Sequence, residues 1–330
     1  MLDLPRIRRI RLSARPRVQR LIGTIALWPN YSLPPRVKIR LEGLERVPAG
    51  PVLYAMNHTD RYNYWPFQYQ LWRTAGRFTA TWVKGKYYER ELLARFMEWT
   101  NNIPTVSRGY IITKDVGATL GRRPTDEEYA ALRGLVDARA GAPGLPELPS
   151  VAPLFKRARD ILGRPFDPTR ETWDEAISAV FDAMMARFVE LNREAVELGL
   201  DVLIFPQGTR SKRLSRGHIG LPQIALTLGL PIVPVGCSGS DKVYPGSSPF
   251  AKGGEVIYRF GAPIGPGEQA AFAPGEPFTP FSPAAERAHR ERFQGLVDVV
   301  MDRIEGLVDE EYRFASGKMS GGVKGSDRFV

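Results

Sequence analysis

The sequence predicts an α/β fold in which a mixed, mainly parallel sheet is flanked by helices. Short apolar runs rich in β-branched and aromatic residues alternate along the chain with longer stretches that have the apolar spacing of amphipathic helices. Strands separated by helices throughout a chain are typical of a layered α/β domain. With 330 residues and 43% hydrophobic content, the chain is long enough for one large domain of this class.

The N-terminal half of this pattern starts at residue 36. The stretch VKIRLEGL alternates between apolar and polar residues, as in a half-buried strand, whereas the apolar run VLYAM after it suits a buried strand. The helix that follows is expected to close near Gly76, because glycine favours helix ends. The predicted elements, in order, are strands over 37–44 and 52–56, a helix over 67–76, a strand over 78–85, a helix over 89–102, and a short strand over 103–109 that runs into a loop.

The second half contains the longest predicted helix, over 170–199. Thr172 is a candidate N-cap and Glu175 stands in capping-box register behind it, so this helix has a clear start. Residues 109–170, in contrast, carry one predicted helix and a stretch rich in Pro and Gly, which is typical of an insertion or a lid. The remaining predicted elements are a strand from 201 that feeds a loop, strands over 230–239 and 254–264, and a helix over 284–308.

We therefore divide the chain into three parts. Residues 1–35 are predicted to be a basic, amphipathic segment that contacts a membrane, residues 36–312 form the α/β domain, and residues 313–330 form a disordered tail. The single cysteine, Cys237, excludes an internal disulfide and fits a reducing compartment. Because Cys237 lies in an apolar run, it is expected to be a small buried residue.

The charge of the chain indicates an anionic partner, because the formal net charge is +10 and the pI is near 9.8. Seven arginines stand among the first 20 residues and precede an apolar stretch that includes Leu21, Ile25 and Trp28. This pattern favours an interfacial helix on an anionic membrane surface, with packing against its own domain as the alternative. The segment is too short and too charged to span a bilayer, so we predict a peripheral protein on the cytoplasmic face. No recognition helix, zinc spacing or ribonucleoprotein-type motif supports nucleic-acid binding.

Polar motifs follow several of the predicted strands, and loops beyond strand ends build the ligand crevice of open α/β sheets. We therefore expect these motifs to form one site. Among the three histidines, His58 directly follows a buried strand and is placed to act as a general base, whereas His218 lies in a loop and His289 in a charged helix. The motifs are Asn57-His58, Arg108, the loop 205–211 and residues 231–234.

Four blocks of the sequence, in this order, resemble the motifs of the glycerolipid acyltransferases, the family typified by lysophosphatidic acid acyltransferases. NHTDRYN (57–63) is similar to the family's Asn-His followed by four residues and an Asp, and IPTVSRG (103–109) to its Arg-bearing second block. FPQGTRS (205–211) is similar to its F-P-E-G-T-R-S block, and LPIVPV (230–235) to its final block. The resemblance covers about residues 40–265 outside the insertion.

The resemblance implies a glycerolipid-acyltransferase-like domain and an enzyme of phospholipid biosynthesis. Such an enzyme moves a fatty acyl group from acyl-CoA or acyl-carrier protein to the hydroxyl of a phosphorylated lysolipid, with 1-acylglycerol-3-phosphate as the expected acceptor. His58 would be the general base on that hydroxyl, so no covalent acyl-enzyme and no cofactor is required. A metal site is not expected either, because the histidines are scattered and there is one cysteine.

The resemblance also assigns residues to substrate binding. Arg108 and Arg210 would hold the phosphate of the acceptor, a role that suits the fork of donors on a guanidinium. Lys84 or Lys86 is a candidate for additional positive charge nearby. The F-P-x-G-T-R-S block would shape a tight loop whose backbone amides face the same anion. The residues of this block assigned to the substrate are Gln207, Gly208, Thr209, Arg210 and Ser211.

Two positions depart from the family pattern in the same chemical sense, because an amide replaces a carboxylate. Asn63 stands in the slot of the Asp that would orient the ring of His58, and Gln207 stands in the slot of the Glu. In serine proteases the swap of the orienting Asp for Asn costs about 10⁴ in rate, whereas papain-like proteases use Asn in this role. Asp60, two residues after His58, is the alternative orienting group, or else it caps the helix that follows.

The two amides leave two interpretations open. Gln207 lowers the repulsion toward an anionic substrate, but it also removes an orienting partner for Arg210. The chain is then either a divergent acyltransferase or a catalytically weak or inactive homologue that binds lipid or acyl carrier at the membrane surface. The aromatic stretch 62–72 favours an apolar groove beside His58, with a plain core as the alternative.

Overall fold

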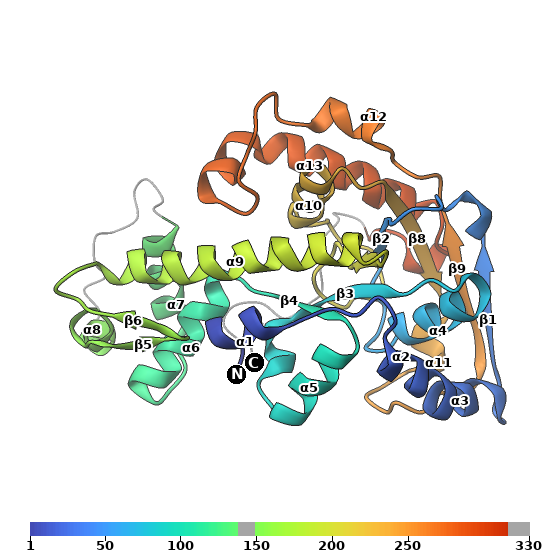
Figure 1. Ribbon diagram of the computed structural model, residues 1–330, viewed down its shortest axis with the longest axis horizontal. Helices are drawn as coiled ribbons and strands as arrows, with labels where there is room; N and C mark the ends of the chain where they lie inside the picture. The colour runs from blue at the N-terminus through green and yellow to red at the C-terminus, as the bar shows by residue number, and fades with distance from the viewer. Residues whose placement is uncertain (138–148, 316–330) are drawn as a thin grey trace.

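The computed structural model describes residues 1–137 and 149–315 of the chain. Its centre is a seven-stranded sheet whose strands all come from the predicted α/β domain (Figure 1). The strands of this sheet are β1 (Val37–Glu42), β2 (Leu53–Met56), β3 (Thr79–Lys84), β4 (Asn102–Thr105), β7 (Asp201–Ile204), β8 (Ile232–Ser238) and β9 (Gly254–Phe260).

Across the sheet the strands follow the order β1-β9-β8-β2-β7-β3-β4. Five of the six neighbouring pairs are parallel, and the pair β8–β9 is antiparallel. The prediction of a mixed, mainly parallel sheet is therefore confirmed. Because β2, β7, β3 and β4 are parallel neighbours, their carboxyl ends meet at one edge of the sheet, and the predicted polar motifs follow these ends.

Helices lie on both sides of the sheet, and the long helix α9 runs parallel to the longest axis of the molecule (Figure 1). The helices are α1 (Leu4–Arg9), α2 (Arg17–Ile22), α3 (Trp28–Ser32), α4 (Tyr64–Ala75), α5 (Glu91–Trp99), α6 (Arg108–Leu120), α7 (Asp126–Val136), α8 (Ala152–Lys156), α9 (Trp173–Glu197), α10 (Gly220–Leu228), α11 (Ser240–Val243), α12 (Pro266–Gln269) and α13 (Pro283–Glu305).

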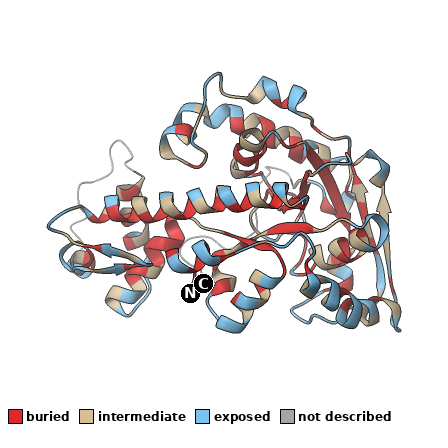
Figure 2. Ribbon diagram, viewed as in Figure 1, coloured by how far each residue is buried: buried red, intermediate tan, exposed pale blue. Residues whose placement is uncertain are grey.

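Both faces of the sheet are buried, as Figure 2 shows for its central strands, and this explains their continuous apolar sequences. In β2, Leu53 and Ala55 join one hydrophobic cluster while Tyr54 and Met56 join a second, because side chains alternate along a strand. The cluster with Leu53 includes residues of α9, α10 and α13, and the cluster with Tyr54 includes residues of α3, α4 and α11. The sheet is thus the middle of three layers.

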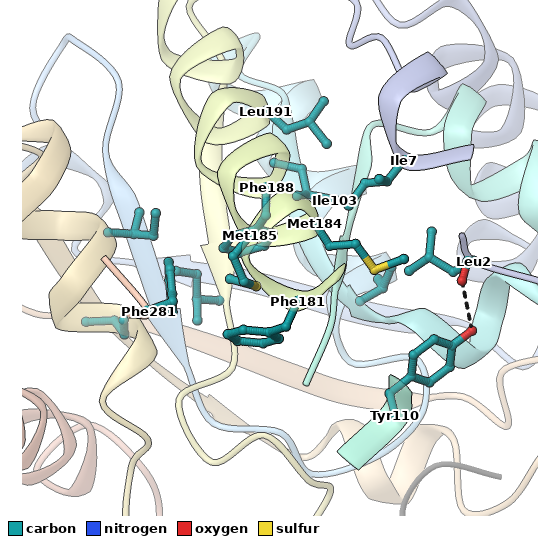
Figure 3. Packing of buried hydrophobic residues seen from close by; sticks show 14 of the residues in the cluster. Leu2, Ile7, Ile103, Tyr110, Phe181, Met184, Met185, Phe188, Leu191 and Phe281 are labelled. Atoms are coloured by element: carbon teal, nitrogen blue, oxygen red, sulfur yellow. Dashed lines mark hydrogen bonds between the residues drawn. The ribbon is translucent and has the colours of Figure 1, made fainter. Parts of the chain in front are cut away.

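The longest helix has the start that the sequence predicts. The side chain of Thr172 accepts the backbone N–H of Glu175, and the Glu175 carboxylate accepts the N–H of Thr172, so the capping box is complete. α9 then places Phe181, Met185 and Phe188 in the core; Figure 3 shows these side chains together with Phe281.

Residues 109–170 contain more regular structure than the single helix predicted there. They hold most of α6, all of α7 and α8, and a hairpin of β5 (Arg159–Ile161) and β6 (Arg164–Phe166), gathered at one end of α9 (Figure 1). A short strand over 103–109 that runs into a loop was predicted here, but β4 ends at Thr105 and Arg108 begins α6, with Ser107 capping the helix by accepting the N–H of Tyr110. The glycines and β-branched residues of α6 have low helix propensity, and packing against α7, α8 and α9 overrides it.

The N-terminal segment divides into two parts. In the first, Leu2 and Ile7 are buried beside α9, and the Tyr110 hydroxyl donates to the Leu2 carbonyl (Figure 3). The second comprises α2, a π-helical turn over Gly23–Leu27 and α3, and it leaves Leu21, Ile25 and Trp28 exposed. None of the helices in the described ranges is long and apolar enough to cross a membrane. From residue 316 on, the predicted disordered tail lies outside the described residues.

Candidate active site

The backbone of His58 is held by the loop that follows β7, the strand next to β2. The His58 N–H donates to the side-chain oxygen of Gln207 at 3.1 Å, and the Ser211 N–H donates to the His58 carbonyl at 2.8 Å. Both backbone groups of His58 are therefore paired with the FPQGTRS loop. Two blocks that are about 150 residues apart in sequence form one rigid unit, because the parallel pairing of β2 and β7 brings their ends together.

Asn57 attaches the other side of the motif to β8. Its side-chain amide donates to the Cys237 carbonyl at 2.9 Å and accepts the Cys237 N–H at 2.7 Å. Asn57 and Cys237 are both buried, so these bonds satisfy backbone groups that water does not reach. The prediction of a buried Cys237 is confirmed.

Asn63 fixes the orientation and the tautomer of the His58 ring. The Asn63 side-chain nitrogen donates to the Asn57 carbonyl at 2.8 Å, which turns the amide oxygen toward His58. That oxygen lies 3.0 Å from Nδ1 of His58 and can only accept, so Nδ1 carries the proton. The Tyr258 hydroxyl holds the Asn63 backbone by donating to its carbonyl at 2.6 Å. Nε2 of His58 is therefore the basic nitrogen, as general-base catalysis requires.

The surroundings of His58 keep its imidazole neutral. The ring stacks on Phe205, with ring centroids 4.1 Å apart. Burial lowers the pKa of His58 to about 3; the hydrogen bond to Asn63 acts in the opposite direction, and Arg210 and Lys84 add to the lowering. An anionic ligand bound to these two cations would cancel part of this effect and make the ring a stronger base.

His58 lines a cavity of about 580 Å³, within the size range of small-molecule sites. Its wall contains both cationic and aromatic side chains, so the cavity suits an anion with an apolar body. Burial lowers the pKa of Lys86, and the neighbouring Arg210 and Arg61 act in the same direction. The cationic residues in this wall are Arg61, Lys84, Lys86 and Arg210; the aromatic ones include Tyr64, Trp65, Trp82, Phe96 and Phe205.

Gly208 allows the loop to turn tightly beside this cavity. Its φ is +65°, a left-handed conformation that glycine adopts readily. A Cβ atom at this position would lie 2.8 Å from the ring of His218, which packs directly against the glycine. Gly208, Thr209 and Arg210 all line the cavity, so the structure brings these three predicted residues to His58.

Two other predicted residues, Gln207 and Asp60, have contacts that differ from their predicted roles. Gln207 is buried and does not line the cavity; its amide nitrogen donates to the Arg213 carbonyl and to the Ser215 hydroxyl, both at 3.3 Å. The Asp60 carboxylate accepts from the Thr59 hydroxyl at 2.9 Å and the Tyr62 N–H at 2.7 Å, so it neither pairs with the His58 ring nor caps α4. Asn63 is the residue that orients the ring.

The structure places Arg108 in a cavity next to that of His58, and not in the same one. This differs from the prediction that Arg108 and Arg210 hold one phosphate. The reason is the strand order, because Arg108 follows β4, which lies three positions from β2, whereas Arg210 follows the adjacent β7. Sequence alone does not contain this order.

Several residues of the site carry no clear signal in the sequence. Phe205 begins the predicted loop 205–211, but nothing in the sequence predicts that its ring stacks on His58. Tyr258, which fixes Asn63, reads as one residue of a strand. His218 was set aside as a loop residue, and only its position against Gly208 reveals that it lines the cavity.

The chain matches no protein-family model, and no curated protein matches its sequence. Among solved structures it is similar to the 1-acyl-sn-glycerophosphate (LPA) acyltransferase PlsC from Thermotoga maritima, with 14% sequence identity and a TM-score of 0.42. This similarity covers 88% of the present chain and 77% of the other. We base the function on the residues of the site itself.

Proposed function

We propose that the protein is an acyltransferase that moves a fatty acyl group from an acyl thioester to the hydroxyl of a phosphorylated lysolipid, with 1-acylglycerol-3-phosphate as the acceptor. The observation that carries this proposal is the fixed ring of His58, whose Nε2 is free of the Asn63 bond, in a cavity lined by both cationic and aromatic side chains. The direct test is thiol release from palmitoyl-CoA and from acyl-carrier protein, with lysophosphatidate in mixed micelles as acceptor.

The reaction needs only groups that are present. Nε2 of His58 takes the proton of the acceptor hydroxyl as its oxygen attacks the thioester carbonyl. When the carbon–sulfur bond breaks, the thiolate leaves and receives the proton from the imidazolium. Asn63 keeps Nδ1 protonated and directed away from the substrates throughout, because its oxygen accepts that N–H.

The acceptor phosphate fits the cations beside His58. Only a few bonds separate the phosphate of a lysophosphatidate from its free hydroxyl, so both groups must lie in one cavity. Arg210 and Lys84 line the cavity of His58 and lower the pKa of the ring, which places their charge near the reacting atoms. The phosphate would bind to Arg210 and Lys84, and the acyl chain of the lysophosphatidate would lie along the aromatic side chains of the cavity.

Arg210→Gln is expected to raise KM for lysophosphatidate by about tenfold, since a hydrogen bond to a charged group contributes about 1.5–3 kcal/mol and this residue is exposed. The kcat value should change less, because the phosphate interaction is present in the ground state as well. The measurement is steady-state kinetics with the acceptor varied. Arg216→Gln, at an exposed arginine outside the cavity, is the control; an equal KM in both variants would remove Arg210 from the phosphate site.

An exposed apolar surface adjoins the catalytic cavity and supports peripheral binding to an anionic membrane. It combines residues of the N-terminal segment with a loop distant in sequence: Ile25 is 64% exposed and Phe250 is 76% exposed. Both line one groove. Trp65 and Phe96 line this groove and also the cavity of His58, so the two share an apolar wall. The large exposed apolar residues in the groove are Ile25, Leu33 and Phe250, and Leu21 and Trp28 of the same N-terminal segment are exposed as well.

Ile25→Glu is expected to weaken binding to phosphatidylglycerol vesicles by about tenfold or more, because burying such a side chain contributes about 1.5–3 kcal/mol. Vesicle co-sedimentation measures this partition. Ala288→Glu is the matched control, since it adds the same charge at an exposed position of α13 on the opposite side of the sheet. Equal loss in both variants, or none in either, would contradict docking through this surface.

A further inference from the structure

A second cavity, of about 360 Å³, lies beside the catalytic one. The two share Trp82, Lys84, Gly208 and His218, so they meet at a common wall. The rest of the second cavity is different in character. It is lined by aromatic and sulfur side chains of α9 and by Phe281, which Figure 3 shows together in the core. The residues that give it this apolar surface are Phe181, Met185, Phe188 and Phe281.

Arg108 is a buried cation in this apolar cavity. Its side chain is 6% exposed, and its guanidinium lies over the ring of Phe181 at 4.2 Å. The carboxylates of Asp137 and Glu286 are each 4.0 Å away, too far for hydrogen bonds, and the contact with the Phe281 carbonyl is long, at 3.5 Å.

The donors of Arg108 are therefore incompletely used. Its Nε has no hydrogen-bond partner among the described residues. Burying a guanidinium without close partners is unfavourable, so this arrangement is expected where a ligand supplies them. Arg133 also lines the cavity; its Nε donates to the Asp137 carboxylate at 2.7 Å, which leaves its two terminal nitrogens as further donors. The planar fork of donors on each side chain suits a phosphate.

The strand order favours the thioester donor as the source of this phosphate. Three strand spacings of about 4.8 Å separate β2 from β4, so the backbones of these two strands are roughly 14 Å apart. In a lysophosphatidate only a few bonds separate the phosphate from the free hydroxyl. In the thioester donor, in contrast, the whole pantetheine chain separates the phosphate from the sulfur.

We propose that the Arg108 cavity binds the 4′-phosphopantetheine arm of the acyl donor, with the phosphate on Arg108 and Arg133 and the chain passing Phe181 toward His58. This proposal rests on the proposed function, whose donor it describes. Coenzyme A and acyl-carrier protein share this arm, so the cavity recognises the chemistry common to both. Arg108 and Arg210 then bind two different phosphates, one from each substrate.

The test is calorimetric binding of 4′-phosphopantetheine and of pantetheine, which lacks the phosphate. The native protein should bind phosphopantetheine more tightly than pantetheine, because only the former offers a phosphate to Arg108 and Arg133. Arg108→Gln should weaken that binding by about 10- to 100-fold, toward the level of pantetheine. The exposed Arg193 of α9 supplies the control, since Arg193→Gln should leave binding unchanged. Coenzyme A and holo-acyl-carrier protein, as further ligands, identify which carrier binds more tightly.

Two further variants protect the test against misfolding of Arg108→Gln. Arg108→Lys keeps a buried charge but loses the planar fork of guanidinium donors, and Arg133→Gln changes a half-buried residue. Both variants should weaken the binding of phosphopantetheine more than the binding of pantetheine. Equal affinity for the two probes, or unchanged affinity in folded variants of both arginines, would overturn the proposal. The two proposals can fail separately. Binding of phosphopantetheine at Arg108 without any acyl transfer would refute the proposed function alone. Acyl transfer in which Arg108→Lys and Arg133→Gln raise KM only for the acceptor would refute the donor site alone.

Discussion

Replacing His58 with alanine is expected to lower the rate of acyl transfer by about 10²- to 10⁴-fold, the usual contribution of a general base. The Asn63 amide oxygen accepts the proton of Nδ1 of His58, which leaves Nε2 for the acceptor hydroxyl. Thiol release from palmitoyl-CoA and acyl-carrier protein, with lysophosphatidate as acceptor, gives the rate. KM for either substrate should change much less than kcat, because the base acts in the transition state.

His289→Ala is the matched control for this variant, because His289 lies in α13 and does not line the catalytic cavity. Its turnover should equal that of the native protein. Thermal unfolding of both variants separates lost catalysis from lost folding, since His58→Ala also removes the stack on Phe205. Undiminished turnover in a folded His58→Ala variant would exclude the proposed mechanism.

Asn63→Leu is expected to have the second largest effect, a loss of about 10²- to 10⁴-fold in kcat. Leucine has nearly the same size but cannot accept the Nδ1 proton, so the neutral ring is free to adopt the tautomer that protonates Nε2. In serine proteases the wrong tautomer at the equivalent ring costs about 10⁴ in kcat. The substitution also leaves the Asn57 carbonyl without its 2.8 Å donor in a buried position, which costs about 1–3 kcal/mol of stability.

Asn63→Asp is the informative comparison for Asn63→Leu. A carboxylate still accepts the proton of Nδ1, so kcat should stay within about tenfold of the native value, because the correct tautomer is kept. Its second oxygen would face the Asn57 carbonyl, which should lower stability in urea by about 1–3 kcal/mol. If the native protein is inactive and the Asn63→Asp variant is active, the amide of Asn63 prevents catalysis. The native protein would then bind lipid without turnover.

The two amides share a property that supports an active site adapted to them. Asn63 donates to the Asn57 carbonyl, and Gln207 donates to the Arg213 carbonyl. An ionised carboxylate cannot make either bond, because it has no donor. Each amide also uses its oxygen, Asn63 toward the His58 ring and Gln207 toward the His58 N–H. In both residues the side-chain nitrogen donates one hydrogen bond and the side-chain oxygen accepts another. This pairing requires an amide, so the two replacements do more than remove a negative charge.

Local patterns in the sequence predicted most of the elements. The capping box of Thr172 and Glu175, the glycine that ends α4 and the apolar runs of β2 and β8 act over a few residues, so they can be recognised without the fold. The main exceptions lie within residues 109–170, where α8 and the hairpin of β5 and β6 were not predicted, and at α6, whose residues have low helix propensity and whose helical conformation depends on packing against α9. The motifs at His58, at Arg108 and over 205–211 were also found, because each follows the end of a strand; residues 231–234, in contrast, lie at the start of β8.

The sequence by itself thus determined the α/β class, the order of most strands and helices along the chain, and the residue types of the site. These features follow from hydrophobic periodicity, caps and motifs, which are local properties. Only the tertiary structure decided that Asn63, and not Asp60, orients His58, and that Arg210 shares the cavity of His58 while Arg108 lies in the next one. The physical reason is that these relations depend on which strands are neighbours and on where buried amides find partners, and both are set by contacts between residues far apart in the chain.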